Sequence, residues 1–99
     1  MREIEKFKIE EGYVAYKMRK LDAIIIFNGL GICDYCAESD VCGYYIPVLN
    51  CYYCEECFND WKDRCIYYEE DIWYENLNIK FVDKVINQNA DMKLLELEK

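Results

Sequence analysis

The amino-acid sequence predicts an α+β fold in which a small cysteine-rich unit lies between two helical segments. All seven cysteines fall within residues 33–65, and the sequence contains no histidine. The same stretch is rich in aromatic and β-branched residues, whereas apolar residues on both sides of it recur at helical spacing. A chain of 99 residues suits one domain. We therefore expect residues 1–99 to form a single domain with three segments, 1–32, 33–65 and 66–99.

The first segment is expected to be helical. Asn28 is followed by Gly29, and both residues tolerate the left-handed conformation that ends a helix. Before this stop, the alternation of Phe7, Lys8 and Ile9 leaves a strand open as an alternative at the start of the chain. A helix is predicted over about residues 11–28, because four apolar residues recur at spacings of four, three and four: Val14, Met18, Leu21 and Ile25.

The middle segment is expected to hold a β-hairpin followed by a helix. Residues 43–48 and 51–53 are rich in β-formers, and they flank Leu49 and Asn50. Pro47 is then expected at an edge or in the turn, because it cannot donate to a strand ladder. A helix should begin after Cys54, since two acids stand in its first turn and apolar residues follow at spacings of three and four: Phe58, Trp61 and Cys65.

The last segment predicts a long helix with two apolar stripes. Three acids at 69–71 open it, and residues 89–91 are expected to end it before a last short element. A surface helix needs only one apolar stripe. Two stripes indicate burial on both sides, either within this chain or between two chains, so we expect a homodimer through the 70–88 helix as one arrangement. The stripes are Trp73, Leu77, Phe81 and Val85, and Ile72, Ile79, Val82 and Ile86.

Two C-x2-C pairs, separated by seventeen residues, predict a metal site. Two thiolates three residues apart can reach one ion, and four sulfurs from two such pairs complete a tetrahedron. Zinc suits this donor set, because it prefers thiolates and imposes no ligand-field geometry. A closed site of four cysteines leaves no open coordination position, so its role would be structural. The predicted ligands are Cys33, Cys36, Cys54 and Cys57.

The order of a ligand turn, a hairpin and ligands in the first turn of a helix resembles a treble-clef zinc finger. The C-x2-C-x17-C-x2-C spacing is similar to that of GATA-type and LIM-like members, over about residues 30–65 only. The resemblance implies a knuckle, a β-hairpin and a helix, flanked here by an N-terminal helix and a long C-terminal helix. It does not carry function across, because GATA fingers read DNA with basic residues and this stretch is acidic.

Three cysteines stand outside the two pairs. Cys51 extends the second pair to C-x2-C-x2-C, which resembles part of a bacterial ferredoxin pattern and makes an iron–sulfur cluster the alternative to zinc. Cys42 and Cys51 would form a switchable disulfide if they faced each other across the hairpin. Cys65 shares the predicted helical face of Trp61 and Phe58, which favours packing in the core.

Charge and composition restrict the classes of function. The net charge is -8, and the middle segment contributes -5 of it. Phosphate binding depends on a basic surface, so no direct nucleic-acid partner is expected. The sequence has neither a histidine nor a Gly-rich phosphate loop, and we expect no enzyme. The longest apolar run has five residues, Ala23–Phe27, which predicts neither a secretory signal nor a membrane span. A cytoplasmic location follows as the expectation.

The sequence therefore favours a small acidic protein with a structural zinc site of four cysteines that acts as a protein–protein interaction module or regulator. Residues with AT-rich codons (Ile, Asn, Tyr, Lys and Phe) total 41, against 12 for Gly, Ala, Arg and Pro, which suggests a low-GC bacterium or its phage. Two alternatives stay open. One is a phage-encoded inhibitor of a host defence nuclease, of the DNA-mimic or anti-CRISPR type. The other is a zinc–thiol redox sensor acting through Cys42, Cys51 or Cys65.

Overall fold

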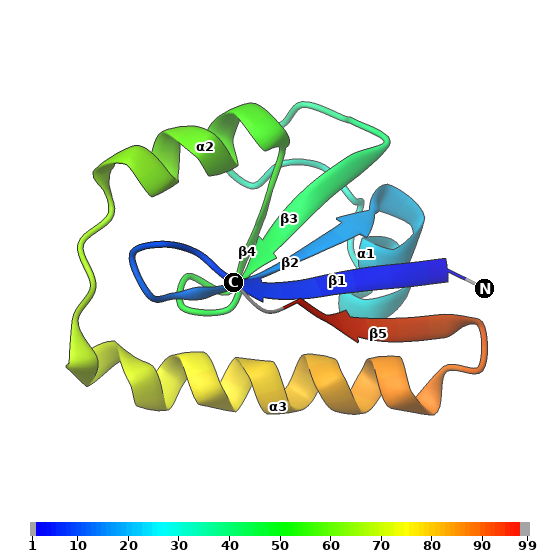
Figure 1. The fold of residues 1–99 in the computed structure, drawn as a ribbon. Coiled ribbons are helices and arrows are strands. Elements are labelled where there is room, and N and C mark those ends of the chain that lie inside the picture. The colour runs from blue at the N-terminus through cyan, green and yellow to red at the C-terminus, as the bar shows by residue number, and fades with distance from the viewer. Residues whose placement is uncertain (1, 98–99) are drawn as a thin grey trace.

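The structure is a computed structural model that describes residues 2–97 (Figure 1). It is a mixed α+β fold with one five-stranded sheet, three α-helices and a short 3-10 turn. The elements in chain order are β1 (Arg2–Lys8), β2 (Val14–Arg19), α1 (Lys20–Phe27), β3 (Cys42–Ile46), β4 (Cys51–Tyr53), α2 (Glu55–Arg64), the 3-10 turn η1 (Glu69–Asp71), α3 (Ile72–Gln88) and β5 (Met92–Glu96).

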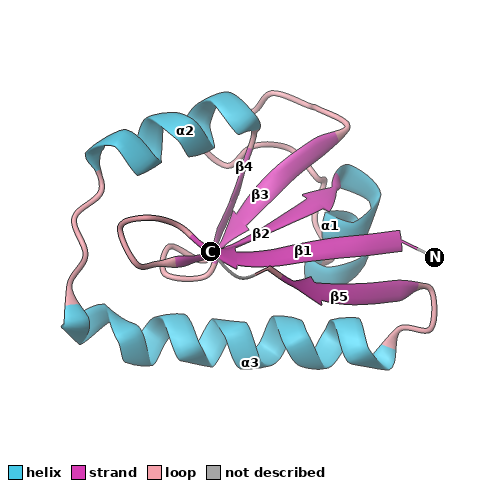
Figure 2. Cartoon of the chain, in the orientation of Figure 1, coloured by secondary structure: helices cyan, strands magenta, loops and turns pink. Residues whose placement is uncertain are grey.

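The sheet joins all three sequence segments. Its strand order is β4-β3-β2-β1-β5, in which β1 and β5 are parallel and the other neighbours are antiparallel. Tyr16 marks the centre of the register, because it lies opposite Lys6 on β1 and Tyr45 on β3. The cysteine-rich hairpin β3–β4 is therefore an extension of the sheet that begins with β1 and β2 (Figure 2).

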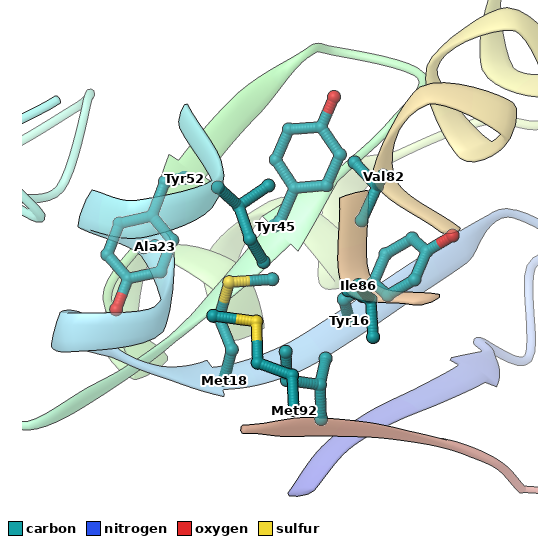
Figure 3. Close-up of a cluster of buried hydrophobic side chains, with 10 residues drawn as sticks. Tyr16, Met18, Ala23, Tyr45, Tyr52, Val82, Ile86 and Met92 are labelled. Carbon is teal, nitrogen blue, oxygen red and sulfur yellow. The ribbon is translucent and has the colours of Figure 1, made fainter. Parts of the chain in front are cut away.

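Helices α1 and α3 cover one face of the sheet. Because side chains alternate along a strand, every second residue of the central strands points to this face. Val82 and Ile86 of α3 are completely buried there, and Ala23 of α1 is buried in the same cluster (Figure 3). The buried members of this first core cluster are Ile4, Tyr16, Met18, Ala23, Ile26, Tyr45, Tyr52, Val82, Ile86 and Met92.

Helix α2 covers part of the opposite face and forms a second core cluster. Its Phe58 ring stacks on Tyr44 of β3, with ring centroids 4.0 Å apart and planes within 7° of parallel. Trp61 follows one turn later and is also buried. The buried members of this second cluster are Ile9, Tyr13, Ala15, Ile46, Phe58 and Trp61. The sheet therefore lies between α2 on one side and α1 with α3 on the other (Figure 1).

Two carboxylates of α3 anchor this helix to the sheet through polar contacts. Asp83 accepts a hydrogen bond from the Tyr16 hydroxyl at 2.6 Å and forms an ion pair with Lys6 at 2.7 Å. Glu75 is buried and accepts a hydrogen bond from the backbone N–H of Val14 at 2.9 Å, at the start of β2. These contacts fix both the position of α3 along the sheet and the face that it turns inward.

The helix predicted over residues 11–28 is wrong in its first half, and so is the description of 1–32 as a helical segment. The chain forms the strands β1 and β2 first, and only residues 20–27 are helical. Val14 and Met18 fit a helical spacing, but together with Tyr16 they fit the period of two as well. Pairing with β1 and β3 selects the strand over the helix, since long-range contacts override a weak local preference. The predicted stop at Asn28 is confirmed, with φ 54° and an N–H donated to the carbonyl of Ile24.

The other predicted elements are found with small changes. The hairpin corresponds to β3 and β4 with Pro47 in its turn, and α2 begins directly after Cys54. The long C-terminal helix is α3, and the short element after it is the strand β5. Of the two predicted stripes on α3, one has Val82 and Ile86 buried on the sheet and Ile79 partly buried beside them. Three members of the other stripe, Trp73, Leu77 and Phe81, are exposed. None of the helices within residues 2–97 has the length and hydropathy that a membrane span requires.

Replacement of Glu75 by Gln should stabilise the protein at neutral pH. Burial raises the pKa of Glu75 above its ordinary value, although the Val14 N–H and Lys8 lower it in part. The native state therefore binds this proton more tightly than the unfolded state, and ionisation of Glu75 costs stability as the pH rises through its raised pKa. In Glu75→Gln the acceptor for the Val14 N–H is kept and the charge is lost.

We expect a gain in the free energy of unfolding at pH 7.5, because the neutral amide removes the charge that burial disfavours. The gain should shrink as the pH falls toward 5, when urea unfolding of both proteins is compared in the same zinc-containing buffer. An equal effect of the substitution at both pH values would contradict this account of Glu75.

Candidate metal centre

The four cysteines of the two C-x2-C pairs meet at the edge of the sheet that β4 forms. Cys33 and Cys36 lie in the turn that follows the loop after α1. Cys54 follows β4 immediately and caps α2, and Cys57 lies in the first turn of that helix. Cys33 and Cys54 are buried, Cys57 is half-buried and Cys36 is exposed. The candidate site therefore has an inner side against the protein and an outer side toward solvent.

Backbone hydrogen bonds close the turn that carries the first pair. The N–H of Cys33 donates to the carbonyl of Glu38 at 2.9 Å, and the N–H of Ala37 donates to the carbonyl of Cys33 at 2.9 Å. Ala37 has φ 62°, in the left-handed region that glycine occupies at little cost. Metal knuckles often have glycine at this place after the second cysteine, and here an alanine adopts the conformation that glycine would favour.

Asp34 connects this turn to the sheet. Its backbone N–H donates to the carbonyl of Tyr52 at 2.8 Å, and its carboxylate Oδ2 accepts from the backbone N–H of Tyr52 at 2.8 Å. The N–H and the carbonyl of Tyr52, which point outward from the edge strand β4, are thereby both hydrogen-bonded. The first pair of cysteines is held against β4, which leads directly to the second pair.

The start of α2 positions the second pair. Cys54 has the extended backbone of an N-cap residue, and its carbonyl accepts the first helical hydrogen bond from the N–H of Phe58 at 2.9 Å. Cys57 follows within the first turn, so its side chain lies on the same end of the helix. Both sulfurs of the second pair therefore lie at the N-terminal end of α2.

The distances among the four sulfurs fit one metal ion. All four Sγ atoms lie within 4.8 Å of one another, and the Sγ atoms of Cys36 and Cys54 are 3.7 Å apart. A tetrahedral zinc ion about 2.3 Å from each sulfur would hold the sulfurs about 3.8 Å apart. The donor set is sulfur alone. These four cysteines can therefore bind a metal ion, and zinc matches both the chemistry and the spacing.

Three of these thiols have shifted pKa values. Burial raises the pKa of Cys33, but the backbone N–H groups of Cys36, Cys54 and Tyr35 outweigh this effect and bring it to about 7. The pKa of Cys57 is raised, first by burial and then by hydrogen bonds with the neighbouring thiols, Cys36 foremost. The N–H of Glu38 lowers the pKa of Cys36, but loss of hydration and the thiols of Cys33 and Cys54 raise it overall.

Aromatic side chains next to the cysteines in sequence contact each other. Tyr35, between the two cysteines of the first pair, packs edge-on against Tyr53 of β4 with ring centroids 6.1 Å apart. The guanidinium of Arg64, at the far end of α2, lies 6.0 Å from the centre of the Tyr35 ring. These contacts connect the turn, the hairpin and the helix, which are the three elements that supply the cysteines.

The remaining three cysteines lie elsewhere. Cys51 pairs with Ile46 in the hairpin, whereas Cys42 pairs with Arg19 at the other end of β3, so the two do not face each other. The predicted alternative of a disulfide across the hairpin is therefore wrong. The Cys51 thiol contacts the carbonyl of Leu49 and stands outside the group of four. Cys65 packs against the second core cluster, as its spacing from Trp61 predicts.

Sequence reasoning missed two contacts that shape this site. The spacing of the cysteines marks Asp34 only as a residue between two ligands. Its carboxylate nevertheless accepts the hydrogen bond from the Tyr52 N–H that a neighbouring strand would otherwise accept. An aspartate next to a turn commonly accepts backbone hydrogen bonds, which is a signal that the sequence does contain. The Tyr35–Arg64 contact has no local signal, because the two residues are far apart in the chain.

Comparison of the chain with protein-family models, curated proteins and solved structures finds no match.

Loss of one ligand should abolish metal binding, whereas loss of a cysteine outside the site should not. For protein purified from cells, we expect about one zinc ion per chain by elemental analysis. Cys54→Ser should lose the metal, because three sulfurs cannot close the tetrahedron. Cys65→Ser should retain it and serves as the matched control. A brown protein that contains iron and sulfide, or equal metal content in the two variants, would contradict the assignment.

Metal affinity should rise steeply with pH. The raised pKa values of Cys36 and Cys57 mean that both thiols hold protons at neutral pH, and a bound ion must displace at least these two. We expect the apparent zinc affinity to increase by at least about 100-fold per pH unit between pH 6 and 8. Competition with a calibrated chromophoric chelator measures it. An affinity that does not change over this range would show that the thiols bind no metal.

Proposed function

We propose that this protein is a protein-interaction module whose fold is stabilised by one structural zinc ion on Cys33, Cys36, Cys54 and Cys57. The observation that carries the interaction role is an apolar surface on α3 that faces away from the sheet. The convergence of four thiols supports the metal role, since they can fill every position of a tetrahedral ion. A closed site of this kind offers no place for a substrate, which supports a non-catalytic role.

The apolar surface consists of Trp73, Leu77 and Phe81, which we call the α3 face. Their exposed fractions are 70%, 58% and 53%, although each is a large hydrophobic residue. Together they expose roughly 400 Å² of mostly apolar surface. An apolar patch of this size on a monomer is often functional, and tryptophan is enriched among residues that anchor interfaces.

The apolar surface continues from α3 toward α1. Phe81 lines a groove of about 680 Å³ that is bounded by the end of α1, the loop after it and the β3–β4 hairpin. Phe27 and Leu30 form part of its wall, and Leu30 is exposed. A contact surface centred on α3 would therefore extend over this groove without crossing a basic region, because no lysine or arginine of the described residues lines it.

We also propose that residues 33–65 form a treble-clef unit, with the turn of the first cysteine pair as its knuckle. The order of this turn, the β3–β4 hairpin and α2 supports this. A cytoplasmic location is supported by the cluster of four cysteines, since clustered cysteines in a reducing compartment bind metal more often than they form disulfides. An acidic inhibitor of a nucleic-acid enzyme would bind through carboxylates instead, and would therefore not depend on the α3 face.

A comparison of three tagged full-length proteins tests the interaction role. Wild-type protein, Leu77→Asp and Leu21→Asp are used to capture partners from cells that express the untagged chain. Leu21 lies on α1 and is exposed to a similar extent as Leu77, at 61%, so Leu21→Asp is the matched control. Wild type and Leu21→Asp should retain the same proteins, and Leu77→Asp should lose them, because a carboxylate cannot be desolvated in an apolar interface.

Both variants should bind zinc and unfold like wild type, since the substituted side chains lie outside the core. Capture that does not change in Leu77→Asp would contradict the role of the α3 face. Another outcome is the capture of a basic nuclease. If this capture is lost when exposed acids of α2 are replaced, the result favours the inhibitor.

A further inference from the structure

We infer that the α3 face binds a second copy of this chain, with the two α3 helices antiparallel and the Leu77 residues of both copies at the two-fold axis. This inference rests on the proposed role of the α3 face as a protein contact surface and names its partner. It follows from how apolar and charged side chains are arranged along this helix.

The apolar residues of the α3 face are symmetric about Leu77. Trp73 lies four residues before it and Phe81 four residues after it. The two copies of an isologous pair are related by a two-fold axis. With this axis at Leu77, a residue that lies n positions before Leu77 on one copy meets the residue that lies n positions after Leu77 on the other. Trp73 of one copy therefore meets Phe81 of the second copy, twice, and Leu77 meets Leu77.

The charges at the ends of the face are opposite in sign about the same point. Glu70, in the 3-10 turn that leads into α3, lies seven residues before Leu77, and Lys84 lies seven residues after it. Both are exposed. On a helix, Lys84 lies within the same arc of about 80° as the three apolar residues. An antiparallel pair thus places Glu70 of each copy near Lys84 of the other.

The parallel orientation has the opposite effect. It would place Glu70 beside Glu70 and Lys84 beside Lys84, and like charges at such contacts disfavour the wrong arrangement. An apolar partner of another kind would need neither the symmetry of the aromatic residues nor the antisymmetry of the charges. The pattern therefore favours a second copy of the same helix over an unrelated partner.

The surface also offers a place for the aromatic ring of the second copy. A shallow groove of about 460 Å³ lies on α3 beside Trp73, and Leu77, Ile79 and Lys80 line it together with Asn76. Phe81 of the second copy meets Trp73 in the inferred register, so its ring would enter this groove. The contact is then centred on the three apolar residues, with Glu70 and Lys84 at its ends.

The available area matches a dimer of moderate affinity. The α3 face supplies roughly half of the 800 Å² that each partner buries in an interface of standard size. The polar side chains beside it would supply the rest as a rim, as is usual for such interfaces. We expect a dimer that dissociates in the micromolar range.

Analytical ultracentrifugation of the full chain, with zinc bound and a reductant present, tests the pairing. Wild type should sediment as a dimer with twice the 12.0 kDa chain mass at high concentration. Glu70→Lys and Lys84→Glu should each weaken the dimer about tenfold, because each turns two attractive contacts into repulsive ones. The double variant Glu70→Lys/Lys84→Glu should recover most of the affinity, since the pairs are restored with their signs exchanged.

Two further variants separate this inference from a general loss of structure. Leu77→Asp should be monomeric, and Leu21→Asp should dimerise like wild type. A wild-type monomer at all concentrations, or a double variant weaker than both single ones, would overturn the inferred pairing. A monomer that still captures another protein through Leu77 would overturn this inference alone, whereas capture independent of Leu77 would overturn the proposed function.

Discussion

The double pairing of β3 is the constraint on which the rest of the structure depends. This strand pairs with β2 on one side and with β4 on the other, so it belongs both to the main sheet and to the cysteine-rich hairpin. Tyr45 faces the first core cluster and Tyr44, its neighbour, faces the second. The same strand thereby fixes the hydrophobic core and the position of β4, which leads to Cys54. A shift of one residue in its register would exchange the two faces and move the second pair of cysteines away from the first.

The energetic balance of this small protein follows from that arrangement. A native domain is stable by only about 5–15 kcal/mol. Zinc in small modules contributes an apparent free energy of about 10–16 kcal/mol at neutral pH. A bound ion would connect the turn at Cys33, the end of β4 and the start of α2, in addition to the contacts of Asp34 and of the Tyr35 ring. The metal would therefore stabilise the edge of the sheet that β4 forms.

Local signals predicted the elements that local interactions determine. The hairpin, the start of α2 and the stop at Asn28 each depend on residues close in sequence, and all three are where the pattern places them. The strand β2 could not be told from a helix, because its apolar residues satisfy both periods until β1 and β3 are in place. The parallel pairing of β1 with β5 joins the two ends of the chain, and no local pattern marks it. At the site, the spacing of the cysteines was enough to identify the four that cluster. The hydrogen bonds by which Asp34 holds their turn to β4 depend on contacts across the fold.

Self-association and metal binding would be coupled although no residue of the α3 face touches a cysteine of the site. A ligand that binds only the folded chain stabilises it, and so does a partner copy. Helix α3 keeps its exposed face outward because Val82, Ile86 and Asp83 are held on the sheet, and the same sheet carries the hairpin with the metal site. Removal of the ion would lower the population of the folded sheet, and with it the concentration of chains that can present the α3 face. The coupling would thus pass through folding itself, and a change in thiol chemistry at one edge of the sheet would alter association at the helix on its other side.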